Sequence, residues 1–239
     1  MAKEQKQIES LHFSNMETKK QITYDEIRHN EEVLTYIKRA DMSLEAMGFT
    51  EHNVAHVTKT AQIAGDILQQ LGYSEHDVEL ARIAGFMHDI GNVVNRIDHA
   101  QSGAIMAFRI LDKLGMPSED VALVISAIGN HDESTAWPVN AVAAALILAD
   151  KSDVRRSRVR PGDNDTTSIH YRVNYAVTKK RTHLDKDKMV FTLQLDIDTE
   201  ISPVIDYFEI FMQRMTLCRM AAKYLGLRFR LVINHAELC

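Results

Sequence analysis

An apolar run ends in a histidine–aspartate pair in the stretch AGFMHDIG, residues 84–91 of this 239-residue chain. Upstream of the pair, Ser74 is followed three residues later by Asp77 and then by apolar residues at helical spacing. This arrangement of a serine and an acidic residue predicts the beginning of a helix, and Gly91 predicts its end. The stretch therefore predicts a helix that carries two polar side chains close to its C-terminal end.

Helical spacing of apolar residues continues on both sides of this stretch. Glycine or proline residues stand near the ends of several of these segments, as expected where helices stop. The further helices are predicted over residues 25–47, 53–71, 98–114, 118–128 and 138–157. The first 158 residues therefore predict six helices and no strand.

The pattern changes after Arg160. Residues 161–165 have the composition of a loop. Apolar residues then occupy alternate positions over 169–177 and over 191–197, which is the period of a strand, with a polar stretch over 179–188 between them. These segments predict an antiparallel pair of strands. A helix over 203–225 and a short strand over 229–233 follow.

Together these segments predict a mainly α fold with a small C-terminal α+β appendage. We expect a flexible lead-in over residues 1–24, a helical domain over 25–160 and the α+β region over 161–239. Two roles for the C-terminal region stay open, since it could form a homodimer surface or pack against the helical domain.

Composition and charge exclude several classes of protein. Lys and Arg number 28 against 33 Asp and Glu, so a dedicated duplex-DNA binder is not expected. The longest apolar run has nine residues, 141–149, where a membrane span needs about 20, and the N-terminus does not resemble a signal peptide. Two cysteines make no disulfide framework. We expect a cytoplasmic protein without a membrane partner.

Histidine and aspartate residues lie in or near the ends of different predicted helices. They are His56, His88, Asp89, His99, His131 and Asp150. Imidazole nitrogens and carboxylate oxygens are ligands of divalent metals, and one carboxylate can contact two ions. The spacing is not that of a zinc finger. A metal site built from these residues would therefore be assembled by folding and would be catalytic in style.

The order of these residues resembles a known signature. His56, the pair His88-Asp89 and Asp150 look like the H…HD…D motif of the HD-domain superfamily, over about residues 25–158. The resemblance implies an HD-type helical bundle and a phosphohydrolase, with His88 and Asp89 at the catalytic centre. Such an enzyme uses a metal-activated water to cleave a phosphomonoester or phosphodiester, commonly of a nucleotide. The implied partner is a small phosphoester or nucleotide substrate.

Two further histidines resemble the additional ligands of two-metal HD proteins, which include the HD-GYP branch and the dinucleoside-tetraphosphate hydrolases. By this resemblance His56, His88, Asp89 and Asp150 would hold one ion, and Asp89, His99 and His131 would hold a second. Asp132 would be a further ligand or would lie beside the ligands. We expect two divalent ions, iron or manganese first, although such ligands also accept Zn, Co, Ni or Mg.

The sequence also departs from the motif. Asn92 stands where many members have lysine, His131 is followed by Asp132 instead of a second histidine, and residues 133–138 contain no Gly-Tyr-Pro. These departures argue against cyclic-di-GMP hydrolysis. They also motivate an alternative function, a catalytically weak or inactive regulatory module that binds metal or nucleotide.

Basic residues follow Asp150 directly. Lys151, Arg155 and Arg158 are predicted to bind substrate phosphate, because guanidinium groups suit phosphate oxygens. Cations at the C-terminal end of a helix also stabilise the helix dipole, and that interpretation is at least as strong. His52 lies one helical turn before His56, and we expect it to face solvent.

Overall fold

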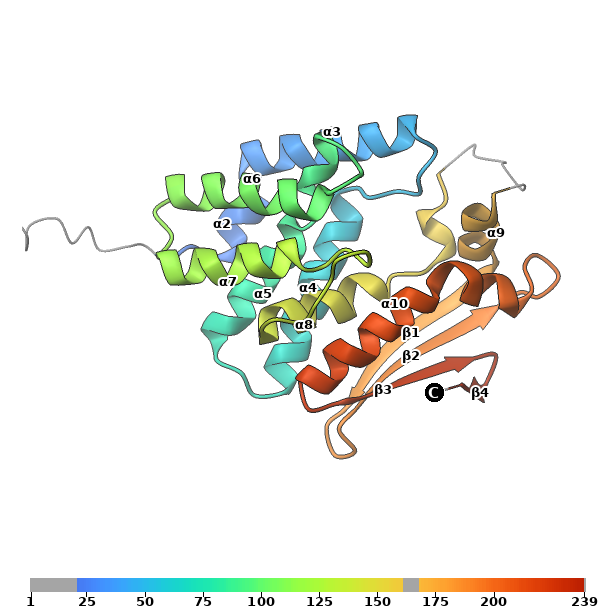
Figure 1. The fold of residues 1–239 in the computed structure, drawn as a ribbon. Coiled ribbons are helices and arrows are strands. Elements are labelled where there is room, and N and C mark those ends of the chain that lie inside the picture. The colour runs from blue at the N-terminus through green and yellow to red at the C-terminus, as the bar shows by residue number, and fades with distance from the viewer. Residues whose placement is uncertain (1–20, 161–167, 239) are drawn as a thin grey trace, which may run out of the picture.

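The computed structural model describes residues 21–160 and 168–238 and shows a group of helices beside a small sheet (Figure 1). Most of the predicted lead-in over 1–24 lies outside the described residues, as does the predicted loop over 161–165. The helices described up to residue 160 are α2 Tyr24–Arg28, α3 Glu31–Ala46, α4 Val54–Gln70, α5 Glu75–Met87, α6 His99–Lys113, α7 Ser118–Gly129 and α8 Ala141–Lys151, with 3₁₀ turns η1 Ile90–Val93 and η2 Arg156–Arg158.

Helix α8 is the centre of the helical part. All of its residues except Ala141 are buried, and α4, α5, α7 and the C-terminal helix α10 (Val204–Tyr224) pack around it. A helix that is apolar on every side is expected to be enclosed in this way. Asn140 caps its first turn by accepting a hydrogen bond from the Ala143 amide. The aspartate at the end of α8 is thereby carried into the interior.

Three predicted helix boundaries are wrong. The segment 25–47 is two helices, because the side chain of Asn30 accepts a hydrogen bond from the Val33 amide and starts a new helix. Helix α5 ends at Met87, so the histidine–aspartate pair follows the helix and leads into η1. Helix α8 ends at Lys151, well before the predicted end near Ser157.

Turn η1 lies very close to the beginning of α6. A Cβ atom at Gly91 would lie 2.0 Å from the His99 carbonyl oxygen and 2.5 Å from the Gly103 amide nitrogen. Only glycine fits such an approach of two backbones. The contact brings His99, the first residue of α6, next to the residues that follow α5.

The C-terminal region forms a four-stranded sheet among the described residues (Figure 1). After α9 (Ile169–Ala176), the strands are β1 Val177–Asp185, β2 Val190–Ile197, β3 Arg228–Ile233 and β4 Ala236–Glu237. Their order is β1-β2-β3-β4, with β2 and β3 parallel and the other neighbours antiparallel. Helix α10 contacts β3 and also α8, so this region packs against the helical part. The homodimer stays a prediction.

One predicted strand is wrong. Residues 169–176 form helix α9, and the first strand of the antiparallel pair is β1, which begins at the last residue of the predicted strand and lies mostly in the stretch predicted to connect the strands. The side chain of Ser168 accepts a hydrogen bond from the Tyr171 amide and caps α9, and Tyr171 stacks on Tyr175 one turn later. The strand over 191–197, the helix over 203–225 and the strand over 229–233 are confirmed within a few residues.

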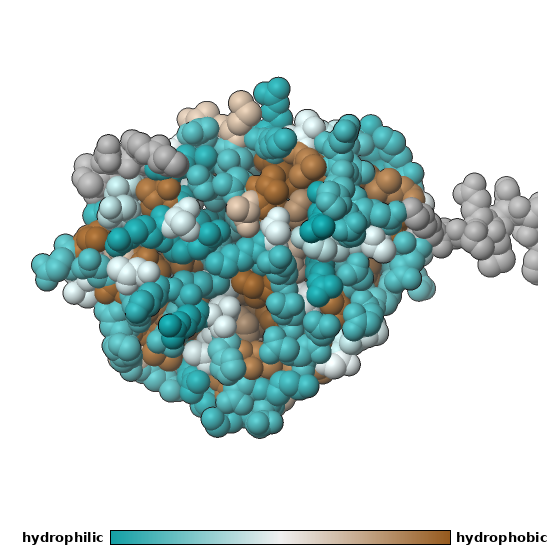
Figure 2. Space-filling view, turned by 180° about the vertical axis from the view of Figure 1, so that it is seen from behind, coloured by the Kyte–Doolittle hydropathy of each residue, from teal (hydrophilic) through white to brown (hydrophobic). Residues whose placement is uncertain are grey.

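The face opposite to Figure 1 is mostly hydrophilic, with separate hydrophobic patches (Figure 2). Among the described residues, no helix combines the length and apolar character that a membrane crossing requires.

Candidate metal centre

Four buried histidines from four parts of the helical region meet in the interior. His56 lies on α4, His88 follows α5, His99 begins α6 and His131 follows α7. Each Nδ1 lies within hydrogen-bonding distance of an oxygen: Asp153 Oδ2 for His56 (2.8 Å), and the carbonyls of Gly85 for His88 (2.9 Å), Arg96 for His99 (3.0 Å) and Ile128 for His131 (2.6 Å). With Nδ1 facing that oxygen, Nε2 is the ring nitrogen that each histidine can offer to a metal.

Asp89 lies between two groups of these histidines. Its Oδ2 is 3.6 Å from His56 Nε2 and 3.2 Å from His88 Nε2. Its Oδ1 is 3.7 Å from His99 Nε2 and 4.0 Å from His131 Nε2. We call His56, His88 and Asp150 the Asp150 half of the cluster, and His99, His131 and Asp132 the Asp132 half. Asp89 thus presents one carboxylate oxygen to each half.

The two halves differ in their second carboxylate. Asp150 Oδ1 lies 3.4 Å from His56 Nε2 and 3.6 Å from His88 Nε2. Asp132 Oδ1 lies 4.0 Å from His99 Nε2, and its side chain is 21% exposed. The structure therefore brings together all six residues that the sequence predicts as ligands, with Asp132 at the edge.

Several polar atoms of the cluster lack the partners that burial demands. Nε2 of His56, Nε2 of His88 and Oδ2 of Asp89 are buried without a hydrogen-bond partner. Ligand atoms of His56, His88 and Asp150 lie within 4.8 Å of one another, as do those of His88, Asp89 and His131. Buried polar atoms are normally satisfied, and imidazole with carboxylate suits divalent transition metals. These residues therefore fit a metal site.

The two halves of the cluster also differ in the protonation of their histidines. Burial lowers the pKa of His99 and of His131, so both rings are neutral near pH 7. Burial acts against charge on His88 too, but the carboxylates of Asp89 and Asp150 raise its pKa to about 10. Despite burial, His88 holds the pKa of Asp89 well below its usual range. In the metal-free protein, His88 is therefore the protonated ring beside two carboxylates.

A chain of ion pairs connects Asp150 to helix α10. Lys151 Nζ lies 2.8 Å from Asp150 Oδ2 and 3.3 Å from Glu133 Oε2, and Arg214 Nε lies 2.5 Å from Glu133 Oε1. Lys151 is buried between these two carboxylates, and Arg214 supplies the second positive charge that balances them. Its predicted contact with substrate phosphate stays a prediction. Sequence analysis missed Glu133 and Arg214, which are far apart in the chain and share no motif.

Asp153 is a second residue that sequence analysis missed. Its side chain is buried, and its Oδ2 contacts His56 Nδ1 at 2.8 Å. Its Oδ1 accepts a hydrogen bond from Arg155 Nε at 2.9 Å, and its carbonyl accepts one from Arg158 Nη1 at 3.1 Å. A carboxylate behind a ligand histidine orients the ring and increases its basicity. Asp153 therefore positions His56.

Asn92, the departure from the lysine of the motif, also has a defined role. Its side chain is fully buried, and its Nδ2 donates hydrogen bonds to Asp89 Oδ1 at 2.9 Å and to the Asp89 carbonyl at 3.0 Å. The amide fixes the orientation of the carboxylate that the two halves share.

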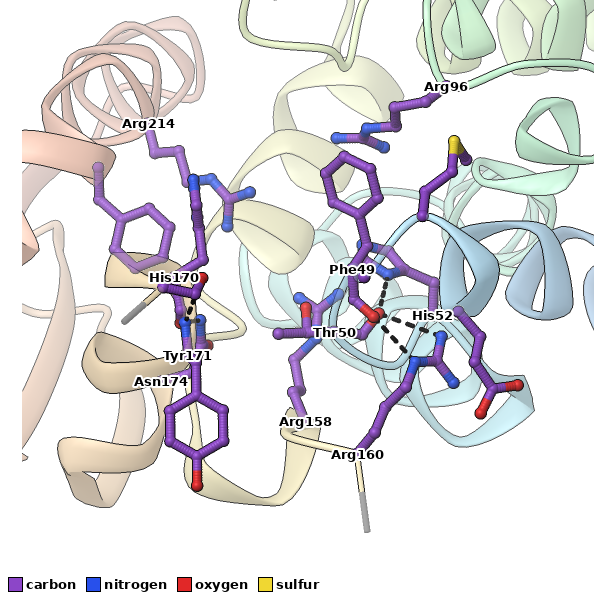
Figure 3. Close-up of a pocket in the computed structure, with 15 residues that line it drawn as sticks. Phe49, Thr50, His52, Arg96, Arg158, Arg160, His170, Tyr171, Asn174 and Arg214 are labelled. Carbon is purple, nitrogen blue, oxygen red and sulfur yellow. Dashed lines mark hydrogen bonds between the residues drawn. The ribbon is translucent and has the colours of Figure 1, made fainter. Parts of the chain in front are cut away.

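A cavity of about 640 Å³ adjoins the cluster (Figure 3). His170, Tyr171, Asn174 and Arg214 lie on one side of it, and Arg96, Phe49, His52 and Arg160 on the other, with Arg158 between. The prediction for His52 is wrong, because this ring is only 9% exposed, lines the cavity and lies 5.5 Å from the His56 ring. Arg96 connects the cavity to the cluster, since its Nη1 is 3.3 Å from His99 Nε2.

Comparison with known proteins agrees with this geometry. Residues 53–161 match the HD domain family. The chain is 26% identical over 159 residues to an uncharacterized protein of Methanocaldococcus jannaschii, covering 57% of this chain and 61% of that protein. It is 32% identical over 126 residues to ribonuclease Y of Oceanobacillus iheyensis, covering 52% of this chain and 21% of the ribonuclease. The chain thus spans less than two thirds of either relative.

A predicted HD superfamily hydrolase from an uncultured Thermotogales bacterium has 25% sequence identity and a TM-score of 0.43, covering 53% of this chain and 69% of that one. The HD domain implies divalent metal binding, and the histidine cluster fits such a site. Residues 53–161, the segment that matches the HD domain family, contain His56, the His88-Asp89 pair and Asp150, so this segment carries the H…HD…D residues of that family.

Proposed function

We infer that this protein is a dinuclear metal-dependent phosphohydrolase that cleaves a phosphomonoester or phosphodiester, of a nucleotide or a nucleotide-like molecule. One observation carries this inference: Asp89 presents Oδ2 to the Nε2 atoms of His56 and His88, and Oδ1 to those of His99 and His131. A carboxylate that faces two groups of imidazole nitrogens is suited to two ions. The HD domain match supports the same chemistry.

His56, His88 and Asp150 would hold one ion, His99 and His131 the other, and Asp89 both. Ions bound there would polarise phosphoryl oxygens and lower the pKa of the water that attacks phosphorus. Around them, Asn92 fixes the Asp89 carboxylate by its hydrogen bond to Oδ1, and Lys151 balances the charge of Asp150. No covalent nucleophile is needed for phosphoryl transfer, which depends on positioning and charge neutralisation.

Elemental analysis of anaerobically purified protein, followed by a hydrolysis screen, tests this function. The screen covers p-nitrophenyl phosphate, bis-p-nitrophenyl phosphate and nucleoside mono-, di- and triphosphates, each with added Mn²⁺ or Fe²⁺. We expect about two ions per chain and hydrolysis of at least one phosphoester. Asp89→Asn should lose both ions and lower the hydrolysis rate by about a thousandfold or more, because both halves lose a ligand.

Asp66→Asn is the matched control, since Asp66 lies on the exposed side of α4 with a side chain that is 57% exposed. It should keep both ions and the full rate. Two bound ions without hydrolysis of any phosphoester would favour the alternative, a regulatory module that keeps the metal. Absence of metal after reconstitution would exclude both functions.

A further inference from the structure

Two guanidinium groups of the cavity have no carboxylate partner among the described residues. The cavity is lined by Arg96, Arg158, Arg160 and Arg214. Arg160 Nη2 lies 2.7 Å from Asp41 Oδ1, and Arg214 is paired with Glu133. Arg96 and Arg158 instead contact only neutral groups: an asparagine oxygen and a histidine nitrogen for Arg96, and backbone carbonyls for Arg158. The cavity therefore carries two guanidinium groups that make no direct ion pair among the described residues, although Glu45 also lines it.

Arg158 is the more unusual of the two. It is only 4% exposed, and it donates from Nε to the Glu51 carbonyl (3.1 Å) and from Nη1 to the Asp153 carbonyl (3.1 Å). Its Nη2 is buried and has no hydrogen-bond partner. A buried cation without a direct ion pair is costly, even with the Asp153 carboxylate nearby, and so is a buried donor without an acceptor. Both costs would be relieved by an anion in the cavity that Arg158 lines (Figure 3).

Arg96 and Arg158 both lie close to the metal centre. Arg96 Nη1 lies 3.3 Å from His99 Nε2, and Arg158 contacts Asp153, which holds His56. The six predicted ligands are not among the residues that line the cavity. An anion between Arg96 and Arg158 would thus lie beside the metal centre and outside it.

We propose that this cavity binds a second phosphoryl group of a small, multiply phosphorylated substrate, with Arg158 and Arg96 as its contacts. The inference rests on the proposed function, which supplies the phosphoester at the metal centre. A volume of about 640 Å³ falls in the range of small-molecule pockets. Guanidinium groups bind phosphate oxygens in pairs of hydrogen bonds. Phe49 and Tyr171, on opposite walls, offer aromatic surface for the remainder of such a molecule.

Calorimetry on the metal-free, full-length protein tests the inference without requiring hydrolysis. The probes are inorganic pyrophosphate, inorganic phosphate, malonate and a ribonucleotide octamer. We expect pyrophosphate to bind more tightly than phosphate or malonate. Arg158→Gln should weaken pyrophosphate binding about tenfold or more, as expected for loss of a charged hydrogen bond. Arg96→Gln should weaken it as well, and is the second variant should Arg158→Gln fail to fold.

Arg109→Gln is the matched control, because Arg109 bears the same charge, has a side chain that is 71% exposed and does not line the cavity. It should bind pyrophosphate as the unmodified protein does. Equal binding of pyrophosphate and phosphate, or equal losses in the Arg109 and Arg158 variants, would overturn the inference. If malonate bound as tightly as pyrophosphate, the cavity would be a carboxylate site instead. If the octamer bound and pyrophosphate did not, the cavity would be an RNA site. A protein that binds pyrophosphate but hydrolyses no phosphoester would contradict only the proposed function.

Discussion

The two halves of the histidine cluster hold their ligands in different ways. In the Asp150 half, the carboxylate of Asp153 lies behind His56, and Lys151 is paired with the buried Asp150. In the Asp132 half, only backbone carbonyls lie behind His99 and His131, and Asp132 is at the edge. A carboxylate behind a histidine strengthens it as a ligand. We therefore expect the Asp150 half to bind metal more tightly and the Asp132 half to exchange its ion more readily.

The largest effect should come from removing the second carboxylate of the Asp150 half, and removal of its counterpart in the Asp132 half should have little effect. Asp150→Asn should reduce the metal content from about two ions to one, since the Asp150 half loses a direct ligand. Asp132→Asn should retain both ions, because its oxygen lies 4.0 Å from His99 Nε2. Elemental analysis after dialysis measures both variants, with circular dichroism to verify folding. Equal ion loss in the two variants would show that the halves do not differ.

A smaller effect is expected from Asp153→Asn, which leaves every predicted ligand in place. The amide cannot support His56 as the carboxylate does, so metal affinity of the Asp150 half should fall about 10- to 100-fold. Chelator competition measures this affinity, and the affinity of the Asp132 half in the same titration is the internal control. An unchanged affinity of the Asp150 half would refute the positioning role of Asp153.

The pH dependence of metal binding should separate the halves further. His88, in the Asp150 half, is protonated in the metal-free protein up to about pH 10, so a metal must displace that proton. Its apparent affinity should therefore rise about tenfold for each pH unit between 7 and 9. Burial lowers the pKa of His99 and His131, so binding in the Asp132 half should be nearly flat over this range. Chelator competition at pH 7, 8 and 9 distinguishes these slopes, and equal slopes would contradict the assignment.

The comparison also shows what sequence could and could not predict. The ligands were predictable because they belong to one ordered motif. Most helices were predictable because the spacing of apolar residues and the capping residues indicated the same segments. The strand prediction for residues 169–176 was wrong because the apolar residues there fit two periods. They occupy alternate positions, but Ile169 and Val173 are also four residues apart, as are Tyr171 and Tyr175, which is a helical spacing. The cap at Ser168 and the stacking of Tyr171 on Tyr175 favour the helix. Periodicity alone cannot decide such a short segment.

The supporting residues were harder to predict, for a physical reason. Asp153 acts through the ring of His56 on another helix, and Arg96 lies beside His99 only because η1 and α6 approach so closely at Gly91. Arg158 is one of several arginines in its segment, and only its burial distinguishes it. Such roles arise from tertiary contacts and leave no pattern in the chain.

The ion pairs from Arg214 through Glu133 and Lys151 to Asp150 have a consequence for how this molecule can be divided. Residues 53–161 match the HD family, yet the counter-charge of Glu133 comes from helix α10, beyond that segment. The same helix and α9 supply one wall of the cavity. An excised HD segment would keep the ligands but lose the electrostatic balance behind Asp150. The segment that matches the family is therefore shorter than the part of the chain that builds the site, which also includes α9 and α10.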